Sequence, residues 1–363
     1  MDIAIIGLPQ SGKTTVFDAL TRGQSSATGS GGPGAQMRVG VVKVPDPRVG
    51  VLAEMYEPKK LVYPEIKYLD LPGQEDSGPY RGIGGRNRNI LQEVDAYLMV
   101  LRAFNDPGVH NSLGGVDPGR DLADMLSELA LSDLEVLERA LERLDDSIKK
   151  SKAQERPVRV RQLEAARMVK ERLEEGVPLR RQELTSSQAE FLTDFQLLTA
   201  KPIIVAFNSD ESGPSPDLSK LDIDPAEAAS LGQVSLCGKL EADLATMTGE
   251  EETLFRQELG VEEPATERVI RASYETLGLV SFLTIGDDEI RAWSVPHGLA
   301  AQKAAGTIHT DFYRGFIRAE VIPYDDLVRC GSIAQGRKEG VLRSEGKTYP
   351  VQDGDVIDFL INV

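Results

Sequence analysis

The feature that most constrains this chain is a glycine-rich segment near its start, Gly7-Leu8-Pro9-Gln10-Ser11-Gly12-Lys13-Thr14. It follows an apolar run at residues 3–6 and precedes a helical pattern with apolar residues on one side. Glycines let the backbone curl so that N–H groups point at phosphates, the lysine reaches the β- and γ-phosphates, and the next hydroxyl binds Mg²⁺. We therefore predict a P-loop in which residues 7–15, Thr15 included, bind nucleotide, Lys13 is catalytic and Thr14 is a Mg²⁺ ligand.

A second segment, Asp70-Leu71-Pro72-Gly73, follows a strand-like run at residues 63–69. In switch-type nucleotidases an Asp in this position holds Mg²⁺ through water, and the Gly N–H senses the γ-phosphate. We therefore expect Asp70 to be the second Mg²⁺ residue and Gly73 to couple the γ-phosphate to the loop that follows. Taken alone, the segment also fits a turn that closes a strand.

Two further apolar runs, at residues 96–101 and 202–207, alternate with helical patterns. Such an alternation predicts an α/β fold with a doubly wound, mostly parallel sheet, whose carboxyl ends carry the ligand loops. The last of these runs leads directly into Asn208-Ser209-Asp210-Glu211.

That tetrapeptide stands where guanine-specific enzymes carry Asn-Lys-x-Asp. Ser209 replaces the lysine that stacks on the base, and Glu211 replaces the aspartate that accepts from guanine. Asn208 can still pair with the N6 amine and N7 of adenine. We expect Asn208, Ser209 and Glu211 to lie at the base, with Cys237 and Gly238 also lining the base pocket, and ATP to be preferred over GTP. A turn at a strand end is the alternative.

The middle of the chain predicts a hairpin of two long helices. Apolar residues recur at coiled-coil spacing from Ala130 to Ile148, and similar spacing continues from Leu163 to Leu173. Residues 149–181 contain eleven basic and five acidic residues, in a chain whose net charge is −17. This basic arm is a candidate contact for RNA or the ribosome. An ordinary solvated helix face explains it equally well.

The 363 residues suffice for two or three domains, and two distant cysteines make a disulfide framework unexpected. No apolar run reaches the length of a membrane span, so we expect a cytoplasmic protein with no membrane partner. We also expect the protein to be a monomer. From residue 282 onward, short strands with glycine-rich turns predict a small mixed β domain, including strands at residues 349–351 and 356–361.

At this point the chain resembles the YchF (Obg-like ATPase) family from end to end. The similar segments are the P-loop, Pro45-Asp46-Pro47-Arg48, Val116-Asp117-Pro118, Asn208 to Glu211, Ala304-Ala305-Gly306-Thr307-Ile308-His309-Thr310-Asp311-Phe312, Gly315-Phe316-Ile317-Arg318-Ala319-Glu320-Val321 and Val351-Gln352-Asp353-Gly354-Asp355-Val356. The resemblance implies an NTPase that usually prefers ATP, an inserted helical hairpin, a C-terminal TGS domain of β-grasp fold and association with ribosomes.

Two of the chain's departures from that family concern predicted site residues. Gln10 stands where the family has an Asn, and because that Asn helps hold an activating K⁺ in related enzymes, K⁺ dependence is in doubt. Gln74 stands where the family has an apolar residue, and Asp70 to Glu75 instead resembles the Asp-Thr-Ala-Gly-Gln-Glu of Ras-type GTPases, whose Gln orients the attacking water. We therefore expect Gln74 to be catalytic, with a polar bystander on the loop as the alternative.

The sequence thus predicts an Mg²⁺-dependent P-loop NTPase that acts as a slow nucleotide switch for a ribosome- or RNA-bound partner. The alternatives are a GTP-specific GTPase and a binding module that barely hydrolyses nucleotide. We expect residues 1–118 and 186–281 to form the nucleotide-binding domain, residues 119–185 the hairpin and residues 282–363 the TGS domain.

Overall fold

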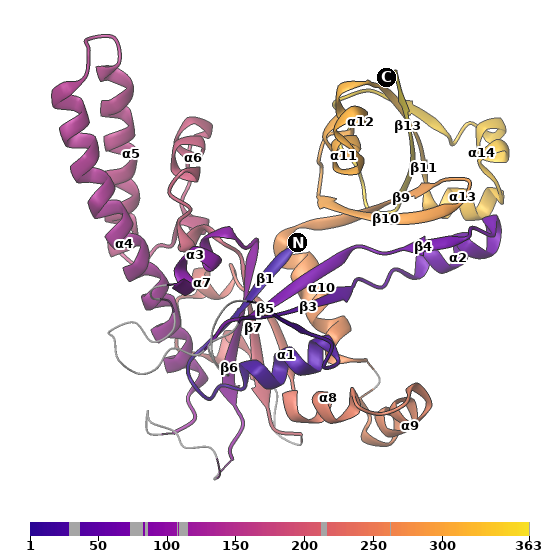
Figure 1. The fold of residues 1–363 in the computed structure, drawn as a ribbon, viewed down its shortest axis with the longest axis horizontal. Coiled ribbons are helices and arrows are strands. Elements are labelled where there is room, and N and C mark those ends of the chain that lie inside the picture. The colour runs from indigo at the N-terminus through magenta and orange to yellow at the C-terminus, as the bar shows by residue number, and fades with distance from the viewer. Residues whose placement is uncertain are drawn as a thin grey trace. The chain divides into compact units, whose positions relative to one another are not determined.

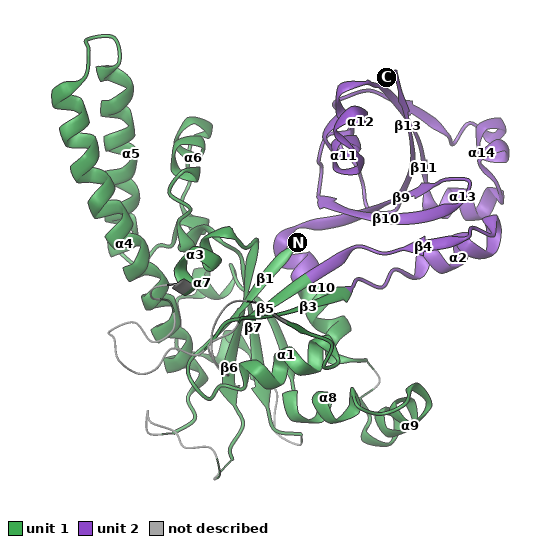
Figure 2. Ribbon diagram, in the orientation of Figure 1, with its two compact units in different colours: residues 1–42, 67–272 green, residues 43–66, 273–363 purple. Residues whose placement is uncertain are grey.

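The computed structural model describes residues 1–28, 37–72, 83, 86–106, 108, 115–211, 216–261 and 263–362 (Figure 1). The chain divides into two compact units, residues 1–42 with 67–272 and residues 43–66 with 273–363 (Figure 2). Across the described ranges, no helix has both the length and the apolar character needed to cross a membrane.

Unit 1 is built on a seven-stranded sheet. The strand order is β2 (Ser26–Thr28), β3 (Met37–Lys43), β5 (Glu65–Asp70), β1 (Asp2–Ile6), β6 (Ala96–Ala103), β7 (Ile203–Ser209) and β8 (Gly232–Leu236). The strands from β5 to β8 pair in parallel, whereas β2 and β3 pair antiparallel at one edge. Every residue of β7 is buried, as expected for a strand covered on both faces. The predicted mostly parallel sheet is confirmed.

Helices cover both faces of this sheet. Ala4 and Ile6 share one apolar cluster with Leu91 of α3 (Arg86–Glu93) and Leu122 of α4 (Pro118–Lys150). Side chains of a strand alternate between faces, so the equally buried Ile3 faces the other side. There α1 (Lys13–Thr21) contacts both β1 and α8 (Gly238–Leu244) (Figure 1). The sheet is therefore doubly wound.

The predicted hairpin is formed by α4 and α5 (Arg156–Glu174), which pack along their apolar seam. Leu137 and Leu144 of α4 lie in one buried cluster with Leu163, Ala166 and Leu173 of α5. The chain returns to the sheet through α6 (Ser186–Thr193), whose start is fixed by a capping box between Thr185 and Gln188. The remaining helical elements of unit 1 are Leu179–Arg181, Leu198–Ala200, Leu218–Lys220, α7 (Pro225–Ala228), α9 (Gly249–Leu259) and most of α10 (Ala265–Leu277).

Unit 2 has a six-stranded mixed sheet. Its order is β12 (Arg343–Glu345), β11 (Phe316–Pro323), β13 (Asp355–Ile361), β9 (Leu279–Ile285), β10 (Glu289–Pro296) and β4 (Lys60–Val62). The first and last long strands of the C-terminal segment, β9 and β13, are parallel neighbours in the middle of the sheet, flanked by antiparallel β10 and β11. Residues of α11 (Ala301–Ile308) pack on this sheet in one apolar cluster. This arrangement is the predicted β-grasp fold.

The other helices of unit 2 are α2 (Pro47–Tyr56), α12 (Thr310–Arg314), α13 (Tyr324–Cys330) and α14 (Ile333–Glu339). Two details differ from the sequence-based expectations. Residues 349–351 do not form a strand, since a single bridge joins Pro350 to Ala300. Residues 43–66 belong to unit 2 and not to the nucleotide-binding part, because β4 pairs with β10 and Val49 and Leu52 of α2 are buried against that sheet. The other predicted domain boundaries stay predictions.

Candidate nucleotide-binding site

The predicted P-loop connects β1 to α1, and two close backbone approaches in it require glycine. A Cβ on Gly7 would lie 2.4 Å from the carbonyl oxygen of Val100, and one on Gly12 would lie 2.2 Å from Nδ2 of Asn208. Gly12 also has φ of 90°, a conformation that side chains disfavour. The Leu8 side chain is buried in the core of unit 1 and anchors the loop. The loop is therefore held tightly between neighbouring strands.

The first turn of α1 is open to an anion. The helix begins at Lys13 after Gly12, and its first turn contains no acidic residue. Among the residues that the structure describes, no side chain caps its N–H groups. The first N–H groups of a helix have no partner within the helix, and the helix dipole favours negative charge at this end. A strand, a glycine loop and an uncapped helix start together make a phosphate cradle.

The Lys13 ammonium lies over this loop. Its Nζ donates hydrogen bonds to the carbonyl oxygens of Gly7 at 2.9 Å and Leu8 at 2.8 Å. Burial lowers the Lys13 pKa to about 8, against the opposing influence of the Asp70 carboxylate. In the part of the chain that the structure describes, the hydrogen-bond partners of the cation are thus neutral carbonyls. A phosphate oxygen can replace them as a stronger partner, because it is charged.

The two predicted Mg²⁺ residues meet beside Lys13. The Thr14 hydroxyl donates to Oδ2 of Asp70 at 3.2 Å. Asp70 is 6% exposed, and burial raises its pKa, although the Thr14 hydrogen bond, Arg38 and Lys13 act in the opposite direction. Its other oxygen, Oδ1, is buried and has no hydrogen-bond partner within the described ranges. A hydroxyl next to a carboxylate with an unused oxygen fits the hard-oxygen donor set that Mg²⁺ prefers.

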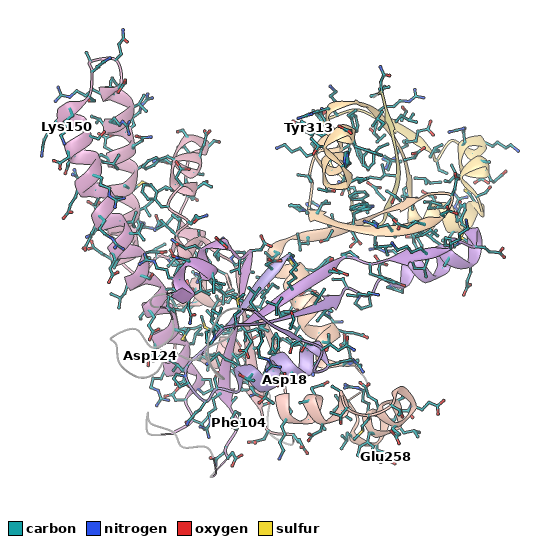
Figure 3. The ribbon with its side chains drawn as sticks, in the orientation of Figure 1. Asp18, Phe104, Asp124, Lys150, Glu258 and Tyr313 are labelled. Atoms are coloured by element: carbon teal, nitrogen blue, oxygen red, sulfur yellow. The ribbon has the colours of Figure 1, made fainter. Side chains whose placement is uncertain are left out.

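Sequence reasoning missed a cation at this place. Arg38 of β3 pairs with Asp18 of α1, which is labelled in Figure 3, and one guanidinium nitrogen lies 3.9 Å from Oδ2 of Asp70. The guanidinium also stacks 4.7 Å from the centre of the Phe17 ring. Nothing local in the sequence marks Arg38, because its partners come from α1 and β5 and meet it only through the sheet.

Asn208 joins the P-loop to the start of α8. Its Nδ2 donates to the Ser11 carbonyl at 3.1 Å, and its Oδ1 accepts from the Gly238 N–H at 2.9 Å. The side chain is 5% exposed. The amide that we expected to read the base is therefore already paired at both ends with backbone, and its visible role is to brace two loops.

The neighbours of Asn208 differ in how they are placed. Ser209 is buried and its hydroxyl lies 3.4 Å from the Leu236 carbonyl, so it cannot stack on a base as a lysine stem does. Asp210 accepts from the N–H of Asn105 at 3.1 Å, and Glu211 is exposed. Cys237 precedes α8, and burial raises the pKa of its thiol, as does the nearby Glu211 carboxylate. Ser209, Glu211, Cys237 and Gly238 are thus gathered at one edge of the sheet.

The other predicted residues fall into two groups. Pro9, Gln10 and Thr15 are exposed on the loop and the first turn of α1. Gly73 and Gln74 lie outside the described residues, so their predicted roles stay predictions.

The chain is similar to known proteins over almost its whole length. Residues 2–139 match a family described as "50S ribosome-binding GTPase", and residues 279–362 match the C-terminal YchF-GTPase family, described as "Protein of unknown function (DUF933)". The chain is 37% identical to "Ribosome-binding ATPase YchF" of Bacillus subtilis and 36% identical to the protein of that name from Escherichia coli O157:H7, over 99% of this chain and 98% of each relative. The "Schizosaccharomyces pombe YchF GTPase" structure superposes with a TM-score of 0.81 at 26% identity, covering 99% of this chain and 97% of that one.

Proposed function

The chain belongs to the YchF family, and from this premise we propose that it hydrolyses a nucleoside triphosphate with Mg²⁺, prefers ATP, and works in the cytoplasm as a switch on the ribosome. The observation that carries the proposal is the junction of β1 and α1, where a glycine loop, Lys13, Thr14 and Asp70 converge.

Lys13 is the residue that acts on the transferring phosphate. Among the described residues, its ammonium donates hydrogen bonds to the carbonyls of Gly7 and Leu8, and the Asp70 carboxylate also attracts it. A bound triphosphate replaces those carbonyls with anionic oxygens, and the fixed positive charge stabilises the negative charge of the transition state. The N–H groups of the loop and of the first turn of α1 hold the same oxygens in place.

Thr14 and Asp70 are the residues that would hold Mg²⁺. When bound there, the ion would neutralise part of the charge of the β- and γ-phosphates. Arg38 of β3, which is itself paired with Asp18, lies 3.9 Å from Asp70 and attracts its carboxylate. The predicted Gly73 contact with the γ-phosphate and the positioning of water by Gln74 complete the proposal.

The proposed preference for ATP rests on the position of Ser209 and Glu211 beside the expected base. A guanine site needs a buried carboxylate for the ring N–H and the exocyclic amine, but Glu211 is exposed and Ser209 is turned toward the Leu236 carbonyl. Beyond its two backbone bonds Asn208 has one further N–H and one further lone pair, and we propose that these contact adenine when ATP is bound. ATP should therefore bind at least as tightly as GTP.

The hairpin supports a ribosomal RNA partner. Of its basic residues, Lys149, Lys170, Arg172 and Arg181 are held in salt bridges with nearby carboxylates. Within residues 118–174, all of which the structure describes, no salt bridge reaches a second group of basic residues. Arg167 of this group lies further along α5, and the others lie toward the free end of the hairpin, where Figure 3 labels Lys150: Lys150, Lys152, Arg156, Arg159 and Arg161. Unpaired cations gathered at one end of a net-negative protein attract phosphate backbones. The alternative of a solvated face predicts no RNA affinity.

Equilibrium titration of the purified protein with ATP and GTP, with and without Mg²⁺, tests the proposal and its alternatives. We expect Mg²⁺ to tighten binding and ATP to bind at least as tightly as GTP. A clear advantage of about tenfold for GTP, about 1.4 kcal/mol, would favour the GTPase alternative. Binding of both nucleotides without hydrolysis would favour the binding module.

A further inference from the structure

Helix α9 buries charged side chains and exposes apolar ones, which is the reverse of an ordinary amphipathic helix. Its buried residues are the charged Glu252 and Arg256, each 6% exposed. Leu254, Phe255 and Leu259 are exposed by 63%, 47% and 46%. A single exposed leucine is ordinary, but three large apolar side chains within two turns, on a helix that buries ions, mark a surface made for contact.

The buried ions explain why α9 is held in this orientation. Glu252 forms a salt bridge of two hydrogen bonds, at 2.9 and 3.2 Å, with Arg22, the C-cap residue of α1. Arg256 donates to Glu252 at 3.0 Å and to Glu241 of α8 at 2.7 and 3.3 Å. Breaking such a buried network by turning the helix would leave charges unpaired, which is costly. The ion pairs therefore hold α9 with its apolar side toward solvent.

The exposed side also carries a defined charge. Helical spacing places Glu251 and Glu258 on the same side as Leu254, Phe255 and Leu259, since each lies three or four positions from one of them. Glu258 is labelled on this helix in Figure 3. The surface is thus apolar with carboxylates between the apolar side chains.

This combination restricts the occupant. Carboxylates repel the phosphates of RNA, so the surface does not suit a nucleic acid. A second copy of this chain would place the same glutamates against each other in a protein of net charge −17. A partner protein that has an apolar pocket bordered by lysine and arginine would match both the apolar side chains and the carboxylates of this surface.

We propose that the α9 surface, formed by Leu254, Phe255, Leu259, Glu251 and Glu258, docks on a basic protein of the ribosome and not on its RNA. The inference rests on the proposed ribosomal function and adds a protein contact to the RNA contact of the hairpin. Through Arg22 and Glu241 the docked helix is joined to α1 and α8, the two helices that begin at the phosphate and base loops.

The first experiment measures binding of the full-length protein to purified ribosomes by sedimentation. The double variant Leu254→Gln with Phe255→Gln removes the apolar contact and keeps the buried ions, so we expect binding at least about tenfold weaker, with unchanged ATP hydrolysis in the absence of ribosomes. The matched control is Val328→Gln, an exposed apolar residue on helix α13, which should bind like wild type. Equal binding of wild type and double variant would overturn the inference and leave the proposed function standing. Failure of the wild type to bind would overturn both.

The second experiment identifies the partner with a photo-crosslinking amino acid at position 255, and at position 328 as control. The expected product from position 255 is a crosslink to a basic ribosomal protein. A crosslink to ribosomal RNA, to a second copy of the chain, or within the chain itself would each contradict the inference.

Discussion

Replacing Asn208 by alanine should destabilise the protein even when no nucleotide is present. The structure gives this amide two buried hydrogen bonds, to the Ser11 carbonyl at 3.1 Å and from the Gly238 N–H at 2.9 Å. Alanine removes the amide N–H and the amide oxygen. The Ser11 carbonyl and the Gly238 N–H are then left unpaired at a position where the Asn208 side chain is only 5% exposed.

The size of the effect follows from the two groups. An unpaired buried polar group costs about 1 to 3 kcal/mol, so the pair should cost about 2 to 6 kcal/mol, at the lower end if water enters the space. About 2 kcal/mol corresponds to a fall in melting temperature of roughly 4 to 8 °C for a unit of this size. Nucleotide affinity should fall as well, since the Ser11 carbonyl belongs to the P-loop.

The assay is thermal unfolding of the nucleotide-free protein, followed by titration with ATP. Ser209→Ala is the matched control, because the Ser209 hydroxyl makes one long contact of 3.4 Å, and its removal should cost less than about 1 kcal/mol. A variant with unchanged melting temperature and weakened ATP binding would refute the bracing role and return Asn208 to a base-reading role alone.

Two further predictions concern residues on other elements. Gln74→Leu keeps the bulk and loses both polar functions, so ATP affinity should stay within about threefold while single-turnover hydrolysis slows at least about tenfold; a wild-type rate at saturating ATP would show a bystander. Asp133 of α4 accepts from the N–H groups of Leu198 and Thr199 at 2.8 and 2.7 Å, and burial raises its pKa to about 6. Because the folded pKa lies above the unfolded value of about 4, its contribution is full below pH 4 and is lost as the pH rises through 6, by at most about 3 kcal/mol. Urea unfolding from pH 4 to 7 should show this loss relative to Asp133→Asn, and parallel curves for the two proteins would contradict it.

The local parts of the structure could be predicted from sequence. The P-loop residues carry their own backbone and charge requirements, so Gly7, Gly12, Lys13 and Thr14 indicate both the fold and the chemistry at one place. The hairpin was predictable for a similar reason, because a seam at coiled-coil spacing has one way to be buried.

The remaining parts depend on contacts between distant residues. Arg38 acquires its position beside Asp70 only when β3 enters the sheet, and Asn208 acquires both partners from separate loops. Residues 60–62 contain nothing that distinguishes a strand of unit 1 from a strand that pairs with β10. In α9 the apolar residues of the sequence would be expected to face the core, but the charged Glu252 and Arg256 are buried instead. A sequence shows which residues are apolar, but it does not show which charged residues will form buried salt bridges.

The central claim, that Lys13 and its loop hydrolyse a nucleoside triphosphate, is tested most directly by multiple-turnover phosphate release from ATP and GTP with Mg²⁺. The account predicts sustained release by the wild type, at least as fast with ATP as with GTP. Lys13→Ala should abolish it, whereas Lys67→Ala, which changes a lysine on β5 that is 52% exposed, should not. Equal turnover of wild type and Lys13→Ala would contradict the account.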